Sequence, residues 1–527
     1  MLYKNRLSRV LSLTVSVIFL VAPLSVGAQQ CDVVPEMVTK LFYPDRGTYT
    51  VWDADYGEGG RQEVFKDSFE QGDGVLAVGE MVRMEGVGPS LMFVRFDRRG
   101  KIVWEKYHSI SGLFEVVGSE AYGAENAQGE RGFVVLANIR KGKERRSSWV
   151  GFFNADGKMV SQKHIRDERF DLSASDINLS VAGDGWVVPV ASSYEIGSGE
   201  SKTIRQNAVI YTLDHEGKDV SSRAYVLGNR NYISSLYVSN SDEGVGGYIA
   251  TGWFENDFGK RQGWLMYLDN DLSMVWQKEF SRGKSANLQK SIIGKNGQIV
   301  TVGGVFPVNG GGEATWIMRL DEVEGKMIWQ RYYYGETGAH DYSPLGVFEN
   351  DDGLITLAMG AVFNPDRADD MVKEEDENAL GDEFPIDLNF TQFLTLNPRG
   401  VTLSGDSYVY GKGVDAFGFS SFRDGRFLLA GRTIVPQENA YKMNDKNDLD
   451  ANEPLLEPSF VGLPDVDMSD KAKAGLAKLR QNIHAQDVDA KAGAGLDNDS
   501  AKSIPLTYNA WVAIADAPNA YEDPCLH

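Results

Sequence analysis

Trp264-Leu-Met-Tyr-Leu-Asp269 is one of a set of short apolar stretches in this chain that end on an Asp or Asn residue. Trp316-Ile-Met-Arg-Leu-Asp321 and Trp511-Val-Ala-Ile-Ala-Asp516 share its pattern, with a Trp five residues before the Asp. The whole set ends at Asp97, Asn154, Asp214, Asp269, Asp321, Asn397 and Asp516. Similar stretches that recur along a chain in this way are typical of repeat folds.

One repeat can be read in full between residues 232 and 280. Its four apolar runs are 232–239, 246–252, 263–269 and 274–280, with Gly, Asn and Asp around them. Short runs rich in β-branched and aromatic residues between turn residues predict strands joined by hairpins. Several runs are apolar at consecutive positions, as expected where both faces of a sheet are covered. A four-stranded sheet packed between similar sheets is a propeller blade, so the seven repeats predict an all-β, seven-bladed β-propeller.

The last repeat ends at Asp516 without a fourth strand, and the N-terminal part of the chain contains a run that would supply one. Residues 48–57 (TYTVWDADYG) resemble the fourth-strand runs at 101–107 and 326–332. A strand from the start of the chain that completes the last blade joins the two ends of the ring. We therefore expect the propeller to be closed by this N-terminal strand.

Residues 1–28 have the pattern of a secretory signal peptide. Lys4, Arg6 and Arg9 precede an apolar stretch over residues 10–26, and small residues follow at the expected cleavage point. The apolar stretch is short and interrupted for a membrane span. We expect a propeller of residues 29–527 in the periplasm or outside the cell, without a transmembrane anchor.

Cys31 and Cys525 are the two cysteines of the chain. Closing the ring by its two ends would make them neighbours, and an exported protein meets an oxidising compartment. We expect a disulfide, which on the chain-entropy model contributes about 4 kcal/mol or more. The alternative is a pair of free thiols.

The net charge of −22 argues against polyanionic partners. Removing residues 1–28 makes the chain more acidic still, because that segment contains basic residues and no acidic ones. Nucleic-acid binding needs a basic surface for the phosphates. No nucleic-acid partner is therefore predicted.

Two acidic segments interrupt the repeats. Residues 364–390 lie in the sixth repeat, and residues 437–505 lie between the second and third strands of the seventh. Ser469 is a candidate helix start within the longer segment. Long insertions on a rigid scaffold often carry function; the alternative is a pair of tolerated surface insertions.

A weak calcium-loop pattern lies in the longer insertion. Asp448, Asp450, Asn452 and Glu453 offer the alternating oxygen ligands of such a loop. The pattern lacks the glycine at the sixth position and the Glu at the twelfth. Calcium is the single cofactor candidate, and no other cofactor is expected.

No sequence motif predicts a catalytic residue. The chain has no Gly-x-Ser-x-Gly, His-Glu-x-x-His, Walker or dinucleotide-binding pattern. His340-Asp341 is the one local pair suited to acid–base chemistry, and a solvated His in a surface turn is the simpler interpretation.

Eight of the ten tryptophans recur at equivalent positions, which indicates packing between blades. The recurring tryptophans are Trp149, Trp264, Trp316 and Trp511 in third strands, and Trp52, Trp104, Trp276 and Trp329 in fourth strands. Trp186 and Trp253 lie in second strands, where a core position and a rim position are both open.

The stretches Phe96 to Trp104 and Leu320 to Trp329 resemble the repeat of secreted bacterial β-propeller proteins, including the quinoprotein-like propellers. The resemblance covers most of residues 48–516 and concerns the fold more than the activity. Quinone-dependent dehydrogenases of that superfamily imply a metal, a quinone and an adjacent cysteine pair, and the chain has no such pair. Its non-catalytic members are envelope scaffolds.

The resemblance therefore implies an exported, non-catalytic module that binds another envelope or extracellular protein or serves as a scaffold. The alternative is an enzyme with a site in the central funnel: a hydrolase, a lyase or a quinone-dependent oxidoreductase. Polar residues converging on the propeller axis would favour the enzyme.

Overall fold

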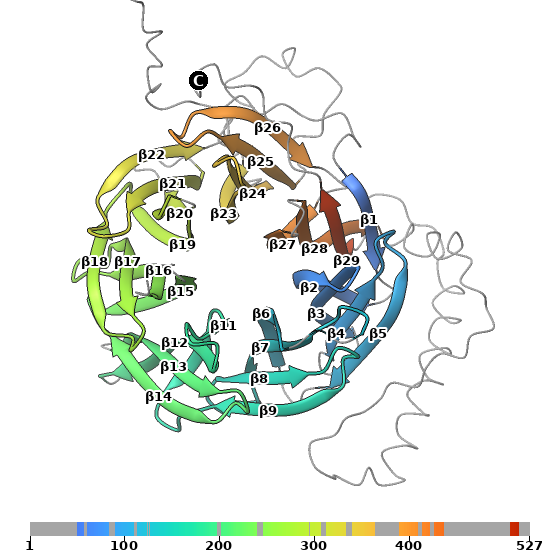
Figure 1. Ribbon diagram of the computed structural model, residues 1–527. Helices are drawn as coiled ribbons and strands as arrows, with labels where there is room; N and C mark the ends of the chain where they lie inside the picture. The colour runs from blue at the N-terminus through green and yellow to red at the C-terminus, as the bar shows by residue number, and fades with distance from the viewer. Residues whose placement is uncertain are drawn as a thin grey trace, which may run out of the picture.

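The computed structural model of this chain describes residues 50–56, 61–83, 90–109, 113–123, 125, 127–197, 202–239, 246–294, 296–306, 312–333, 340–363, 389–408, 414–421, 426–436 and 506–515. The regular secondary structure of these residues consists of β-strands alone, so the fold is all-β. Figure 1 shows the sheets arranged around a central axis.

Four sheets are antiparallel meanders of four consecutive strands. The first contains β2 (Arg61–Gln71), β3 (Gly74–Arg83), β4 (Ser90–Phe96) and β5 (Ile102–Ser109). The second contains β6 (Leu113–Tyr122), β7 (Gly132–Arg140), β8 (Ser147–Phe153) and β9 (Met159–Ile165). Two more contain β19 (Ser285–Ile293), β20 (Gln298–Phe306), β21 (Ala314–Asp321) and β22 (Met327–Tyr333), and β23 (His340–Glu349), β24 (Ile355–Phe363), β25 (Phe390–Leu396) and β26 (Thr402–Tyr408).

A nine-stranded sheet combines two further meanders. One contains β10 (Asp171–Ala174), β11 (Asn178–Leu179), β12 (Gly185–Ile196), β13 (Thr203–Asp214) and β14 (Asp219–Tyr225). The other contains β15 (Arg230–Ser239), β16 (Gly247–Glu255), β17 (Arg261–Asp269) and β18 (Met274–Phe280). A single parallel residue pair, Gln206 with Arg230, joins them. Each meander therefore has four strand positions, with the innermost position of the first one split between β10 and β11.

The remaining sheet contains both ends of the described chain. Its order is β1-β29-β28-β27, with β1 (Thr50–Tyr56), β27 (Val414–Ser421), β28 (Phe427–Pro436) and β29 (Leu506–Ala515). β1 runs antiparallel to β29, and β2 packs against β27, β28 and β29. The last sheet thus lies beside the first.

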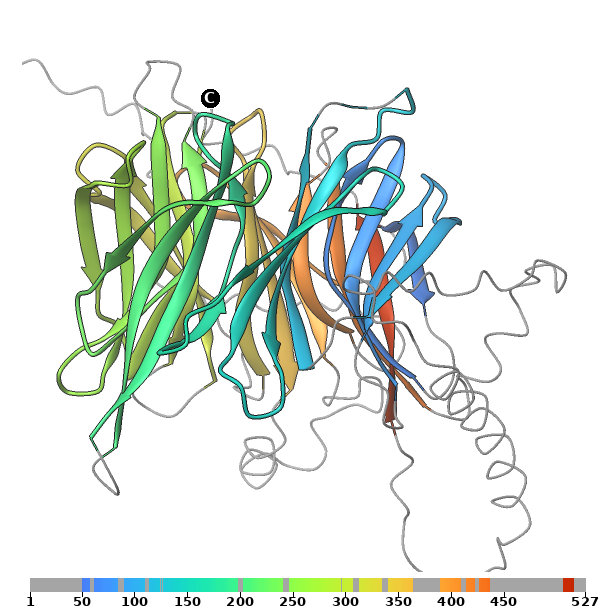
Figure 2. The ribbon, with the colours of Figure 1, turned by 90° about the horizontal axis from the view of Figure 1, so that it is seen from below.

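Buried side chains fill the space between neighbouring sheets. Phe65, Met92 and Val94 of the first sheet form one cluster with Leu428 and Val512 of the last. Comparable clusters lie between the other neighbouring sheets. Figure 2 shows these sheets side by side in a view turned by 90° from Figure 1. The third strands β4 and β25 are buried at every position, because each sheet is covered on both faces. This burial explains the consecutive apolar residues of the sequence.

Three of the recurring third-strand tryptophans pack in the core and bond to the next strand. Trp149, Trp264 and Trp316 are each 1% exposed. Their indole Nε1 groups donate to the Oε1 atoms of Gln162, Gln277 and Gln330, at 2.8, 3.1 and 3.2 Å. The prediction that they are blade-packing residues is confirmed, and Trp186 joins them in the core.

The Asp and Asn residues that end the repeats build the turns that follow. Asp269 Oδ1 accepts hydrogen bonds from the backbone N–H groups of Asp271 at 3.0 Å and Ser273 at 2.7 Å. Asn397 does the same for Arg399 and Val401. Short polar side chains of this kind stabilise tight turns, which is why they recur.

The same turns pack on the outer strand of the preceding sheet. Gly400 has a φ of +77°, and a Cβ there would lie 2.8 Å from the Trp329 ring. The Trp329 indole also donates to the carbonyl oxygen of Pro398 at 3.0 Å. Trp104 with Gly157 and Trp276 with Gly325 repeat this contact. Trp104, Trp276 and Trp329 of the fourth strands therefore join adjacent sheets.

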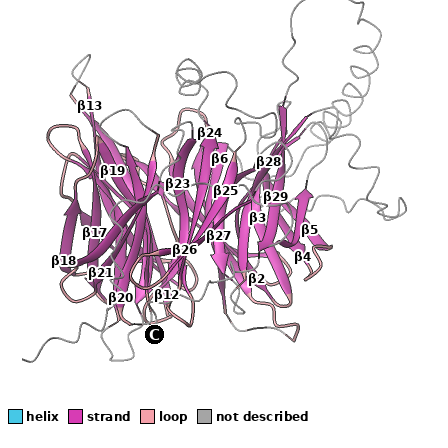
Figure 3. Cartoon of the chain, turned by 90° about the horizontal axis from the view of Figure 1, so that it is seen from above, coloured by secondary structure: helices cyan, strands magenta, loops and turns pink. Residues whose placement is uncertain are grey.

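Several predicted features lie outside the described residues: the signal peptide, Cys31 and Cys525, Asp448, Asp450, Asn452 and Glu453, and the helix after Ser469. The ends of the longer insertion are placed, since Pro436 of β28 is the register partner of Leu506 of β29. Figure 3 shows that these strands run between the two faces of the ring. The part of the chain that the structure describes contains no helix suited to crossing a membrane.

Candidate functional site

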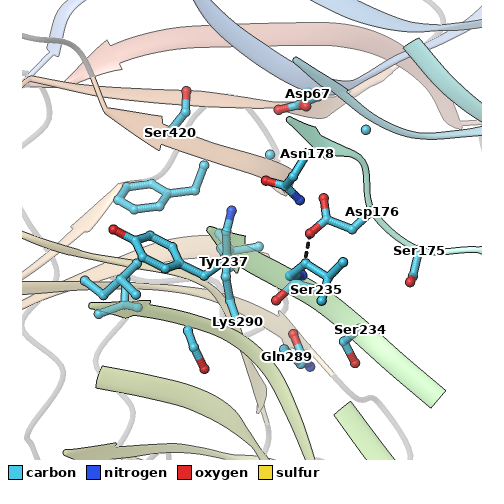
Figure 4. Close-up of a pocket in the computed structure, with 18 of the residues that line it drawn as sticks. Asp67, Ser175, Asp176, Asn178, Ser234, Ser235, Tyr237, Gln289, Lys290 and Ser420 are labelled. Carbon is cyan, nitrogen blue, oxygen red and sulfur yellow. Dashed lines mark hydrogen bonds between the residues drawn. The ribbon is translucent and has the colours of Figure 1, made fainter. Parts of the chain in front are cut away.

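A cavity of about 950 Å³ lies among the innermost strands. β2, β6, β15, β19, β23 and β27 line it, together with residues 175–178 between β10 and β11. Every sheet therefore contributes side chains to one central space (Figure 4).

A register shift occurs in each continuous innermost strand. One residue in each strand is skipped in the pairing with the second strand, which is the mark of a β-bulge. The skipped residues are Lys66, Val117, Ser234, Gln289, Leu345 and Phe417. All of them line the cavity, so the bulges direct these side chains toward the axis.

Glycines in the second strands allow the bulges. A Cβ at Gly79, Gly252, Gly303 or Gly431 would lie 1.9–2.1 Å from a backbone carbonyl oxygen of the innermost strand. Such an approach is possible for glycine alone. The recurrence of glycine at this position is the sequence signal that could have predicted the bulges, and it was missed.

Asp67 joins the first two sheets. Its Oδ2 atom accepts hydrogen bonds from the backbone N–H of Ser119 at 2.8 Å and from the Ser119 hydroxyl at 3.0 Å. Its Oδ1 atom accepts the N–H of Ser68 at 2.8 Å. The carboxylate thus satisfies backbone donors that the bulges leave without ladder partners.

Asp176 plays the same part between β10 and β15. Its Oδ2 atom accepts the backbone N–H of Leu236 at 2.9 Å, and its Oδ1 atom accepts the N–H of Ile177 at 2.9 Å. In Figure 4, Asp67, Asp176 and Asn178 lie around the same part of the cavity, and Lys290 extends toward it. Two of the cavity carboxylates are therefore structural groups that also face the axis.

Glu120 of β6 is the third carboxyl group of the cavity. Burial, together with the negative charges of Asp67 and Asp176, raises its pKa to about 8, against the opposing effect of Lys290 and Arg131. Burial also raises the pKa of Asp176 to about 6, despite its hydrogen bonds. The pKa of Asp67 is raised for the same first reason. The carboxyl groups of the cavity therefore hold their protons more tightly than ordinary carboxyl groups do.

These shifts predict that the protein loses stability as pH rises. Carboxyl groups with raised folded-state pKa values bind more protons in the folded protein than in the unfolded chain, so raising pH favours unfolding. Through Glu120, the unfolding free energy should fall between pH 5 and pH 9, by up to about 1.4 kcal/mol per pH unit. Thermal unfolding of the wild type and Glu120→Gln across this range checks this. A wild-type curve no steeper than that of Glu120→Gln would contradict it.

An aromatic and cationic group lies at the edge of the cavity. Tyr232 and Trp253 stack with ring centroids 5.5 Å apart, and the Arg261 guanidinium lies 4.0 Å from the Trp253 ring centroid. Both rings line the cavity. The sequence left a core position and a rim position open for Trp253. The structure places it at a buried position that lines the cavity.

The interpretation of His340 as a solvated residue of a surface turn is wrong. His340 begins β23 and is 6% exposed. Its ring packs against Phe363 and Phe390, with centroids 5.6 and 5.2 Å away. Phe363 and Phe390 are distant from His340 in the sequence, so the residues next to the His-Asp pair gave no sign of this burial.

No cluster of three or more His, Cys, Asp or Glu side chains suited to a metal ion occurs within the described residues. The three cavity carboxylates are thus not arranged as a metal site. The predicted calcium ligands at 448–453 lie outside the described part of the chain.

No protein-family model matches the chain, and no curated protein matches it. Among solved structures, it is similar to a protein of unknown function from Bacteroides caccae, with a TM-score of 0.34, 9% identity, and coverage of 66% of this chain and 94% of that one. It is also similar to a cobalt-substituted Synechocystis ACO, with a TM-score of 0.37, 10% identity, and coverage of 66% of this chain and 72% of that one. An α-L-arabinofuranosidase from Fusarium graminearum has a TM-score of 0.37 and 11% identity, with coverage of 59% of this chain and 95% of that one. Similarity at this level carries no argument about function.

Proposed function

We propose that this chain is an exported seven-bladed β-propeller, closed by β1, that serves as a non-catalytic protein-binding or scaffold module in the bacterial envelope or outside the cell. Counting the nine-stranded sheet as two blades gives the seven blades of the proposal. The pairing of β1 with β29 supports the closure. The partner of this proposal is another envelope or extracellular protein.

The placement of the long insertions supports this proposal most directly. Residues 364–388 connect β24 to β25, and residues 437–505 connect β28 to β29. Both connect a second strand to a third strand, so both leave the ring at the same face. On that face the β7–β8 connection carries Arg140, Lys143 and Arg145, all exposed. The strand ends that lead into the acidic segments lie on the same face as these basic residues, which favours a charged surface there for a protein partner.

Excising the longer insertion tests the proposal. A short turn from Pro436 to Leu506 joins residues that are already register partners, so the unfolding free energy should change by about 1 kcal/mol at most. Binding partners are first identified by mass spectrometry after capture from envelope extract. The affinity of one purified partner is then measured by calorimetry for the full chain and for the trimmed chain.

The expected result is that the trimmed chain keeps its melting temperature and loses the partner. A chain with residues 364–388 replaced by a turn shows how much the shorter acidic segment contributes to the affinity. If the trimmed chain binds the purified partner as tightly as the full chain does, the insertion is not the recognition element. Unfolding of the trimmed chain would show that the insertion belongs to the core.

A second candidate function is catalysis in the central cavity. The observation that favours it is a set of carboxyl groups with raised pKa values on different strands, which is the arrangement that acid–base catalysts use. Acid–base chemistry of this kind suits a hydrolase or a lyase; the quinone-dependent oxidoreductase is the other enzyme class of this candidate. Turnover that Glu120→Gln abolishes would establish it over the binding module.

A further inference from the structure

Two ionisable groups of the central cavity, one acidic and one basic, have no hydrogen bond or ion pair among the described residues. Glu120 of β6 makes no hydrogen bond or ion pair with any residue in the described ranges. The Lys290 ammonium of β19 likewise has no ion pair there, although it acts on the pKa values of Glu120 and Asp176. Both residues line the same cavity.

The other charged groups of the cavity are already engaged. Asp67 and Asp176 accept backbone N–H groups. Lys66 lies 4.0 Å from Glu80 and over the Phe417 ring. Glu349 pairs with Arg319 at 3.4 Å. Glu120 and Lys290 are therefore the two charged side chains of the lining that are left for a ligand.

The two groups come from opposite sides of the central space. The strands β10 to β18 lie between β6 and β19 along the ring, and Figure 1 shows β6 and β19 across the axis from each other. The volume of about 950 Å³ suits a small molecule. The Ser235 hydroxyl, at a lining residue that is 7% exposed, also has no hydrogen-bond partner among the described residues. Glu120 is half-buried and Lys290 is exposed, so both can be reached by a ligand, and the buried hydroxyl without a partner favours a polar occupant.

We propose that the central cavity binds a small organic zwitterion, with the ammonium group of the ligand at Glu120 and its carboxylate at Lys290. A ligand with both charges can pair with Glu120 and with Lys290 at the same time. A dication would leave Lys290 opposed to a like charge, and a dianion would place a carboxylate beside Glu120, Asp67 and Asp176.

The binding should release a proton at neutral pH. The raised pKa of Glu120 means that its carboxyl group holds a proton in the empty cavity, and an ammonium group replaces that proton. The groups that act on Glu120 are Asp67 of β2, Asp176, Lys290 of β19 and Arg131. Affinity should therefore rise as pH increases toward 8.

A matched set of probes tests the charge pattern. The probes are ω-amino acids from 4-aminobutanoate to 8-aminooctanoate, with 1,5-diaminopentane and glutarate as dication and dianion. Calorimetry with the full chain should give at least tenfold tighter binding for one of the ω-amino acids than for either control probe. Titrations in two buffers of different ionisation enthalpy should report proton release.

Four variants assign the two ends of the ligand. Glu120→Gln should weaken the ω-amino acid at least tenfold and leave glutarate no weaker. Lys290→Gln should weaken the ω-amino acid at least tenfold and leave the diamine no weaker. Glu115→Gln and Lys284→Gln carry the same charge changes at exposed positions outside the lining and should change nothing. Thermal unfolding confirms that each variant is folded.

The proposal is overturned by any of three results. The first is no binding of any ω-amino acid at millimolar concentration to the folded chain. The second is tighter binding of the diamine or of glutarate than of every ω-amino acid, which would identify a cation site or an anion site. The third is zwitterion binding that neither cavity variant weakens.

Discussion

Replacing Arg319 by Met should lower the free energy of unfolding by about 3–5 kcal/mol. Arg319 is 1% exposed and lies between two sheets. Its Nη2 atom lies 3.4 Å from the Glu349 carboxylate and donates to Asn296 Oδ1 at 2.9 Å. Its Nη1 atom donates to the Pro398 carbonyl oxygen at 3.1 Å. The substitution removes the guanidinium and leaves a buried carboxylate in place, which is the costly way to break a buried pair.

Chemical denaturation of Arg319→Met measures this loss. The double variant Arg319→Met/Glu349→Met removes both charges and should recover a large part of the lost stability. Well-packed apolar residues often replace a buried ion pair without loss of stability. Arg169→Met breaks the exposed pair of Arg169 with Asp167 and should cost about 1 kcal/mol at most. Equal losses in Arg319→Met and Arg169→Met would refute the argument.

Replacing Gly303 by Ala should cost about 3 kcal/mol and should also impair the cavity. A Cβ at Gly303 would lie 2.0 Å from the Asn287 carbonyl oxygen and 2.9 Å from the Leu288 Cα atom. Both contacts are with backbone atoms of β19, so the strand has to move. Lys290 follows the bulge directly, and its ammonium should leave its position.

Gly360→Ala is the control for this substitution. Its Cβ would meet Leu345 at 3.7 Å, an ordinary contact, so the variant should keep its stability to within about 0.5 kcal/mol. Thermal unfolding and the calorimetric affinity for the ω-amino acid are compared for both variants. A Gly303→Ala protein as stable as Gly360→Ala would show that β19 yields without cost.

The sequence predicts the sheets well because local chemistry repeats. The turns after the third strands need an Asp or Asn to bond their backbone, as Asp269 does, and several interfaces between sheets contain a Trp such as Trp316. These needs recur from sheet to sheet, so the residues appear at repeated positions. The all-β fold and the apolar third strands follow from them.

The cavity could not be predicted in this way. The cavity residues Asp67, Glu120, Asp176 and Lys290 come from four different sheets. None of them belongs to the residue pattern that recurs from sheet to sheet. Their proximity depends on the arrangement of the sheets around the central axis, which no spacing along the chain encodes. The raised pKa of Glu120 arises from the charges of distant residues and from burial. His340 was misjudged for the same reason, since Phe363 and Phe390 surround it from other strands.

The pairing of β1 with β29 sets an order of folding. Thr50 is the register partner of Ala515, so the first strand to be synthesised has no partner until nearly the whole chain has been made. At roughly 5–20 residues per second, that interval is on the order of a minute. Until then the apolar residues of β2 that contact β28 and β29 face solvent or a chaperone. The intermediate sheets can form one after another from local contacts, whereas the final junction closes a loop of almost the full chain. We therefore expect the meeting of β1 and β29 to be a slow stage of folding, and β2 to be prone to aggregation until it occurs.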